Sequence, residues 1–204
     1  MTYDTSIFWN WFTEHNEQLT MLSELDKAAQ NNLIDQMQTQ LERYCPALTF
    51  DMSDPNKDGR RVVFSAEGDV DFFEPLLKLT DEAPDIDWWE FIPFKQPAGK
   101  DVRLRFDKYT FDTKKMLFMQ LENNEEPDIL ALRVAFDGAE GDNEDMLVGT
   151  YTAIETIIGE FDCATLLGYF EICPTPENPQ QEGYRPLSQL SDFVEWFKQQ
   201  REKQ

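Results

Sequence analysis

The chain turns from strand into helix at the stretch Val62-Val63-Phe64-Ser65-Ala66-Glu67-Gly68-Asp69, and nearly the same letters return at Val134-Ala135-Phe136-Asp137-Gly138-Ala139-Glu140-Gly141-Asp142. In each copy a glycine permits a sharp exit from the strand, and an aspartate can cap the helix that follows. Because the likeness falls at the same kind of joint, it indicates two related halves.

The segments around these two joints have the same order of predicted elements. Residues 48–94 read as strand, strand, helix, strand, and residues 116–173 read the same way. We therefore predict an α+β fold, in which a mostly antiparallel sheet is covered by helices and a ββαβ unit is duplicated. The expected organisation is a single globular domain over residues 1–204, with pseudo-repeat halves at 48–97 and 101–173.

Extra helices are predicted at both ends of the chain. Apolar residues at helical spacing favour one helix around residues 7–15 and a second from Leu22 to Tyr44, which Pro46 prevents from continuing. Near the C-terminus, Ser188 is predicted to cap a last helix.

The composition is that of a folded and strongly acidic protein. Of 204 residues, 40 are acidic and 18 basic, which gives a formal net charge of −22, while 41% are apolar. This apolar content is too high for a disordered chain. Each quarter of the sequence carries a net charge of −5 or −6, so the acidity belongs to the whole surface. Such a surface repels nucleic acid and anionic membranes, which favours a basic protein as the partner.

The sequence predicts a cytoplasmic protein without a cofactor. Its first residues lack the pattern of a signal peptide, and no stretch approaches the roughly 20 apolar residues of a membrane span. The three cysteines, Cys45, Cys163 and Cys173, are odd in number and lack metal-ligand spacing. We expect them to be reduced thiols.

Motifs of known enzyme chemistry do not occur in the sequence. It contains no G-x-S-x-G motif, phosphate-binding loop, H-E-x-x-H motif or dinucleotide fingerprint. The single histidine, His15, lies on the apolar side of the first predicted helix, where a partly buried, hydrogen-bonded imidazole is expected. We therefore expect a protein without catalytic residues.

One loop resembles the start of a calcium-binding loop. The segment Asp54-Pro55-Asn56-Lys57-Asp58-Gly59 matches D-x-N-x-D-G, so Asp54, Asn56 and Asp58 are weak candidate metal ligands. The twelfth position, however, is Ser65 rather than glutamate, and the flanking segments are predicted strands. We therefore favour a hairpin connection without a metal.

Two tryptophans and three arginines are the candidate binding residues. Trp9 and Trp196 fall beside the main apolar stripes of the terminal helices, so each could contact a protein partner, with packing of the two helices as the alternative. Arg103, Arg105 and Arg133 project from the polar faces of strands expected to be neighbours. Together they would form a basic patch for a carboxylate or phosphate, with cross-strand pairing to acids as the alternative.

A resemblance to known sequences covers the first half of the chain. It rests on Phe8-Trp9-Asn10-Trp11-Phe12, on the strand end Ser65–Gly68, and on Ala83-Pro84 before Trp88-Trp89. This pattern resembles uncharacterised bacterial proteins of unknown function. The resemblance implies a bacterial source and nothing about activity.

Two functional hypotheses follow from the sequence. The first is a non-catalytic cytoplasmic interaction protein that binds a basic protein, in the manner of an immunity or inhibitor protein. The alternative is a small-ligand-binding protein or an enzyme that uses carboxylates and the arginine patch. The even negative charge favours the first.

Overall fold

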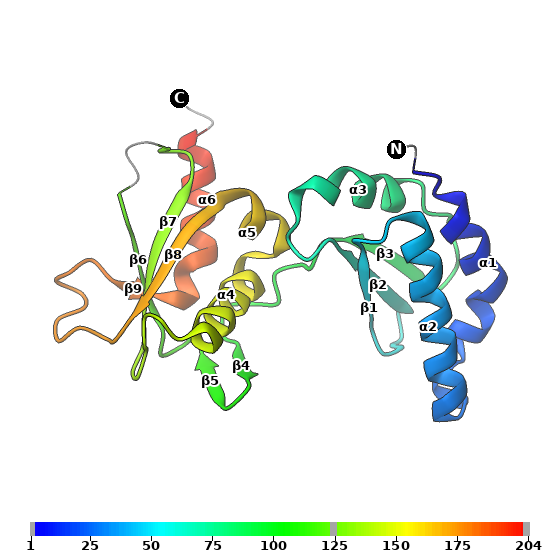
Figure 1. Ribbon diagram of the computed structural model, residues 1–204, viewed down its shortest axis with the longest axis horizontal. Coiled ribbons are helices and arrows are strands. Elements are labelled where there is room, and N and C mark those ends of the chain that lie inside the picture. Colours follow the sequence, from blue (N-terminus) through cyan, green and yellow to red (C-terminus); the bar gives the residue numbers. More distant parts are fainter. Residues whose placement is uncertain (1–2, 123–125, 202–204) are drawn as a thin grey trace. The chain divides into compact units, whose positions relative to one another are not determined.

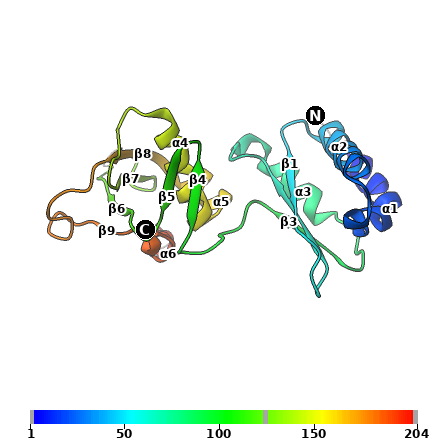
Figure 2. The same cartoon turned by 90° about the horizontal axis from the view of Figure 1, so that it is seen from below.

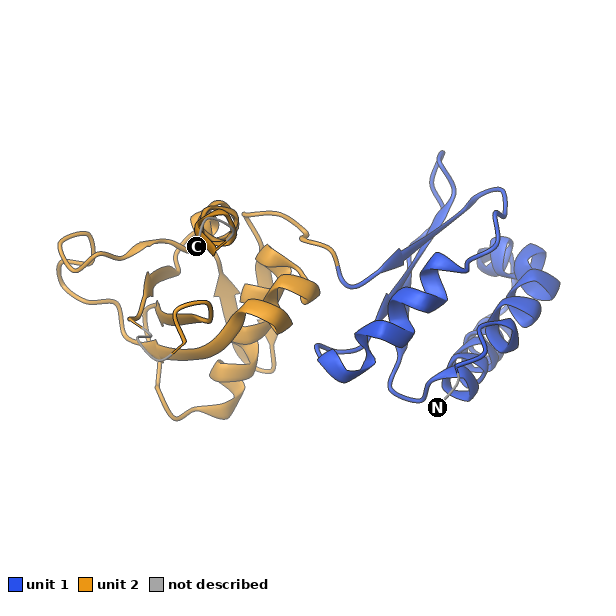
Figure 3. Cartoon of the chain, turned by 90° about the horizontal axis from the view of Figure 1, so that it is seen from above, with its two compact units in different colours: residues 1–95 blue, residues 96–204 orange. Residues whose placement is uncertain are grey.

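The computed structural model of the protein describes residues 3–122 and 126–201. It consists of two compact units, residues 1–95 and residues 96–204 (Figure 3). The boundary falls between Lys95 and Gln96, one residue before Pro97-Ala98-Gly99. Both units contain helices and a sheet, and most strand pairings in the described residues are antiparallel, which confirms the predicted α+β fold.

Unit 1, residues 1–95, contains a three-stranded sheet and three α-helices (Figure 1). Its elements are α1 (Ser6–Thr20), the 3₁₀ turn η1 (Leu22–Glu24), α2 (Lys27–Tyr44), β1 (Thr49–Met52), β2 (Arg60–Ser65), the 3₁₀ turn η2 (Val70–Phe72), α3 (Phe73–Asp81) and β3 (Trp89–Pro93). The strand order is β1-β2-β3; β1 and β2 are antiparallel, whereas β2 and β3 are parallel.

One face of the unit 1 sheet forms the core. Val62 and Phe64 alternate onto this face and are fully buried. The Phe64 ring lies 5.5 Å from that of Phe8, so α1 packs directly on the sheet. The Trp9 indole donates a hydrogen bond to the Leu79 carbonyl (2.9 Å), which joins α1 to α3 on the same side.

In unit 2, residues 96–204, the described residues 96–122 and 126–201 form a four-stranded sheet, a separate hairpin and three α-helices. Its elements are β4 (Arg103–Phe106), β5 (Tyr109–Asp112), β6 (Leu117–Gln120), β7 (Leu130–Ala135), α4 (Glu144–Ile158), α5 (Glu160–Leu166), β8 (Leu167–Cys173), β9 (Arg185–Pro186), the 3₁₀ turn η3 (Leu187–Gln189) and α6 (Leu190–Arg201). The strand order of the larger sheet is β8-β7-β6-β9, and β4 pairs with β5 alone.

The core of unit 2 lies between its larger sheet and its helices. Leu132 and Val134 on β7 are fully buried, and the ring of Phe118 on β6 lies 5.4 Å from that of Phe193 on α6. Figure 2 shows the β4–β5 hairpin beside α4, against which Phe111 is buried. The hairpin is thus fastened to the unit through α4.

Both units contain the same strand arrangement. In each, an antiparallel hairpin is followed by a helical crossover to a parallel strand: β1-β2-α3-β3 in unit 1 and β6-β7-α4-α5-β8 in unit 2. An arginine and a glutamate also face each other at the parallel pairing in both, as Arg61 with Glu90 and as Arg133 with Glu171. The duplication stays a prediction, and this matched ion pair supports it.

Candidate functional site

The three candidate arginines lie on two different sheets. Arg103 and Arg105 are exposed on β4, which pairs only with β5, whereas Arg133 lies on β7 between β6 and β8. The expected pairing of neighbouring strands was therefore wrong. Arg133 is bound to Glu171, whose pKa is lowered by hydrogen bonds from Arg133 and the Tyr169 hydroxyl. At Arg133 the structure therefore has the alternative to a basic patch, in which the arginine pairs with an acid on the neighbouring strand.

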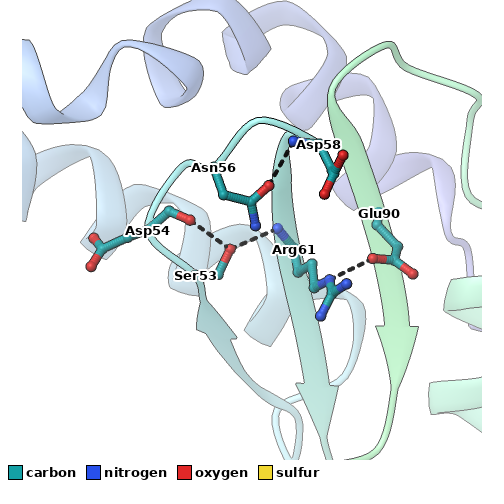
Figure 4. Close-up of polar contacts among 6 residues, drawn as sticks. All are labelled: Ser53, Asp54, Asn56, Asp58, Arg61 and Glu90. Carbon is teal, nitrogen blue, oxygen red and sulfur yellow. Dashed lines mark hydrogen bonds and ion pairs between the residues drawn. The ribbon is translucent and has the colours of Figure 1, made fainter.

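The calcium-like loop is the connection of the β1–β2 hairpin. The Asn56 side-chain oxygen accepts a hydrogen bond from the Asp58 backbone N–H (2.7 Å), and Asn56 bridges to Gly59. In Figure 4 the Asp54 carboxylate points away from that of Asp58, so their oxygens do not converge. Over residues 3–122 and 126–201, no group of three or more His, Cys, Asp or Glu side chains could hold a metal ion.

The two candidate tryptophans differ in exposure. Trp9 is only 5% exposed and belongs to the core of unit 1, so its predicted role as a partner contact is corrected to packing. Trp196 is 50% exposed on α6. His15 is half-buried; its ring stacks on Trp11 and its Nδ1 lies 2.8 Å from the Trp11 carbonyl oxygen, which confirms the expected hydrogen-bonded imidazole.

Trp196 lines a hollow of about 480 Å³ in unit 2. The Arg185 guanidinium shares this hollow and lies 5.6 Å from the centre of the Phe193 ring. Asp192 also lines it and is paired with Lys100 at 2.6 Å. The hollow therefore presents an aromatic wall with mixed charge, which selects neither a cationic nor an anionic ligand strongly.

A groove of about 580 Å³ beside Trp88 in unit 1 has a single charge sign. Trp88 is 62% exposed, more than any other large hydrophobic side chain in the described residues, and Met21 beside it is 48% exposed. Three carboxylates line the groove, those of Glu17, Asp85 and Asp87, and no basic residue is among the described residues that do. The groove is both acidic and aromatic.

The end of α1 adds to the negative potential of this groove. Helix α1 ends at Thr20, which lines the groove, and its last turn carries no basic residue. The carbonyl groups at the C-terminus of a helix hold a partial negative charge and favour cations. The backbone carbonyl groups and the carboxylate side chains therefore both make the potential in the groove negative.

The exposure of Trp88 is enforced by its backbone. Trp88 has φ +73°, a conformation that a bulky residue adopts only when its surroundings require it. Its carbonyl accepts a hydrogen bond from the Arg60 N–H (2.8 Å), and the Trp89 N–H donates to the Ile86 carbonyl (3.1 Å). Gly59 lies so close that a Cβ atom there would be 2.4 Å from the Trp88 oxygen. The hairpin thus positions the indole ring.

Replacing Gly59 by alanine should destabilise unit 1 by about 2–3 kcal/mol, because Gly59 has φ +113° and its added methyl group would strike the Trp88 carbonyl. Gly99→Ala is the matched control, since Gly99 has φ +121° but a Cβ atom added there would meet no other atom within 4 Å. Urea unfolding measures both, and the control should lose only about 1–2 kcal/mol. If both variants lose the same free energy of unfolding, the close contact between Gly59 and the Trp88 carbonyl does not contribute to the effect.

Sequence reasoning missed Trp88 as a surface residue, although a signal was present. The segment Asp85-Ile86-Asp87-Trp88 follows Pro84 and places two carboxylates next to a tryptophan outside any predicted helix. The aromatic and apolar residues that follow favour a strand from Trp88 to Phe94, so the sequence predicts Trp88 as part of that strand. The structure begins β3 at Trp89 and leaves Trp88 outside.

Comparison with known proteins identifies no relative: no protein-family model, curated protein or solved structure matches the chain. Across the described residues, none of the helices combines the length and apolar character needed to cross a membrane. The functional argument therefore rests on the site alone.

Proposed function

We propose that the protein is a non-catalytic, cytoplasmic interaction protein that binds a basic protein partner, in the manner of an immunity or inhibitor protein. The observation that supports this most is the groove beside Trp88, where an exposed indole ring stands among three carboxylates. The three cysteines are free thiols, as is usual in a reducing compartment.

A lysine or arginine side chain of the partner fits the chemistry of this groove. Its apolar stem would lie on the Trp88 ring and Met21, and its charged end would reach Asp85, Asp87 or Glu17. A cation–π contact at an exposed site contributes about 0.5–1 kcal/mol, and each exposed ion pair about 0.2–1 kcal/mol. These values are modest, so the groove selects the partner and wider contact supplies the remaining affinity.

The charge of unit 1 assists the encounter with such a partner. Residues 1–95 contain 19 acidic and 7 basic residues. A surface of one sign raises the association rate with an oppositely charged protein and makes binding weaken as salt is added. A complex of this kind is therefore expected to be strongly salt-dependent.

The test measures the binding of a short oligolysine peptide to the full chain by titration calorimetry. Trp88→Ala should weaken binding roughly two- to fivefold, because it removes the aromatic surface. Asp85→Asn combined with Asp87→Asn should weaken it by a similar factor. An oligoglutamate peptide of equal length should not bind.

The matched control is Asp35→Asn combined with Glu42→Gln. Both residues are exposed on α2, and the pair changes the net charge by the same amount as the groove variant. If the α2 variant weakens oligolysine binding as much as the groove variant does, binding depends on total charge alone, and the proposal fails. A salt-insensitive complex would also contradict it.

A further inference from the structure

Arg60 is a buried arginine without a hydrogen-bond or ion-pair partner in the described residues, although the charge of Asp54 acts on its guanidinium. It is the first residue of β2, its side chain lies on the core face of the sheet, and only 6% of the residue is exposed. Its backbone N–H donates to Trp88, but no hydrogen bond or ion pair of its guanidinium occurs within residues 3–122 and 126–201, and its Nε is shielded from solvent. Buried charged groups normally have an acceptor or a counter-ion.

A second buried donor stands opposite Arg60. Trp89 occupies the facing position on β3, and its indole N–H likewise has no acceptor in the part of the chain that the structure describes. Trp89 does not line the hollow that Arg60 lines, so its indole N–H is a separate unpaired donor on the side of β3. Buried N–H groups in proteins are almost always paired, so the Arg60 guanidinium by itself points to a ligand or ordered solvent in that hollow.

Arg60 lines a hollow of about 420 Å³ in unit 1. The hollow lies between η1 and α2 on one side and β1 with the start of the hairpin on the other. Its apolar walls come from Leu22, Ile34, Phe50 and Met52. The volume is within the usual range for small-molecule sites, which are mostly apolar with a few fixed polar groups.

The polar groups of the hollow suit an anion with a single charge. The Gln30 amide donates one hydrogen to the Leu25 carbonyl and keeps a second for a ligand, whereas the Ser53 hydroxyl already donates to the Asp54 carbonyl. Arg60 supplies the only positive charge among the lining residues that the structure describes. Asp51 and Asp54 also line the hollow, and their charges repel any anion there, a dianion such as phosphate about twice as strongly as a carboxylate. A carboxylate matches the planar fork of a guanidinium and carries one charge.

We propose that this hollow binds a small organic carboxylate, with its carboxylate group on the Arg60 guanidinium and its apolar body against Leu22, Ile34 and Met52. The site is separate from the groove beside Trp88 and does not rest on the function proposed for that groove. Small-ligand binding is the second functional hypothesis from the sequence, and Arg60 is not one of the three arginines that the sequence indicated for it.

The test uses benzoate and hexanoate as probes, with benzamide as the neutral counterpart of benzoate. Chemical shifts of backbone amides in the full chain report binding. Benzoate is expected to shift the signals of Ser53 and Arg60 in a saturable manner, and benzamide should bind at least tenfold more weakly. Arg60→Met, which keeps an unbranched apolar stem, should weaken benzoate binding at least tenfold.

Arg61→Met is the matched control, because Arg61 lies next in the strand but on the opposite, exposed face, paired with Glu90. It should leave benzoate binding unchanged. Equal binding of benzoate and benzamide to the wild-type chain overturns the proposal, and this comparison decides even if Arg60→Met fails to fold. Stronger binding of inorganic phosphate than of benzoate would overturn the assignment to a carboxylate.

Discussion

Truncation of Phe64 to alanine is expected to destabilise unit 1 by about 3–5 kcal/mol. Phe64 is fully buried, and its ring lies within 6.5 Å of the rings of Phe8, Trp9 and Phe91. Removing it leaves a cavity at the point where α1 meets the sheet. The surrounding rings cannot close such a cavity without moving the helix.

Tryptophan fluorescence during urea unfolding measures this effect in the full chain. Four of the five tryptophans, Trp9, Trp11, Trp88 and Trp89, belong to unit 1, so the signal follows that unit. Val63→Ala is the control: Val63 is the next residue of β2 but lies half-buried on the opposite face, and its loss should be roughly 1 kcal/mol. If both variants lose a similar free energy of unfolding, the face that carries Phe64 is not the core face of the sheet.

The sequence was sufficient to predict the ββαβ segments because their strands are short apolar runs bounded by turn residues. The runs Val62–Phe64 and Leu130–Ala135 are rich in valine and leucine, and most of their side chains are buried. One break was missed: the predicted helix from Leu22 is interrupted, and α2 begins after Asp26, whose side chain caps it.

The arginine patch could not be predicted, since alternation within a strand does not identify the strand beside it. Arg103 and Arg105 do project from one face of a strand, as expected. The partner of that strand is β5, over residues 109–112, which sequence reasoning left unassigned. Pairing is decided by tertiary contacts, and a single missed strand moved the arginines to a different sheet.

The exposure of the tryptophans depended on contacts distant in sequence. Trp9 falls beside the apolar stripe of its helix, yet α1 packs against both the sheet and α3, and this widens its buried face. Trp88 is held at the surface by Gly59 and Arg60, nearly thirty positions earlier in the chain. The same short segment thus positions the indole ring of one site and supplies the guanidinium of the other.

Phe111→Ala should destabilise unit 2 by about 3–5 kcal/mol, because Phe111 is 2% exposed and fastens the β4–β5 hairpin to α4. The Phe111 ring lies against Gly149 of α4, where an added Cβ atom would be 2.1 Å from a Phe111 ring carbon. Alanine is the better helix former by about 1 kcal/mol, so Gly149→Ala would stabilise α4 if the ring were elsewhere. We expect instead a loss of about 1–3 kcal/mol from overpacking.

Combining Gly149→Ala with Phe111→Leu tests whether the two residues act through this contact. The smaller leucine leaves room for the added methyl group, so Gly149→Ala should cost less in the Phe111→Leu background than in the wild type. Hydrogen exchange of α4 peptides measures each variant, and Val148→Ala, at an exposed position of the same helix, should be nearly neutral. If the costs of Gly149→Ala are equal in both backgrounds, the hairpin is not seated on Gly149, because two independent sites would add without coupling.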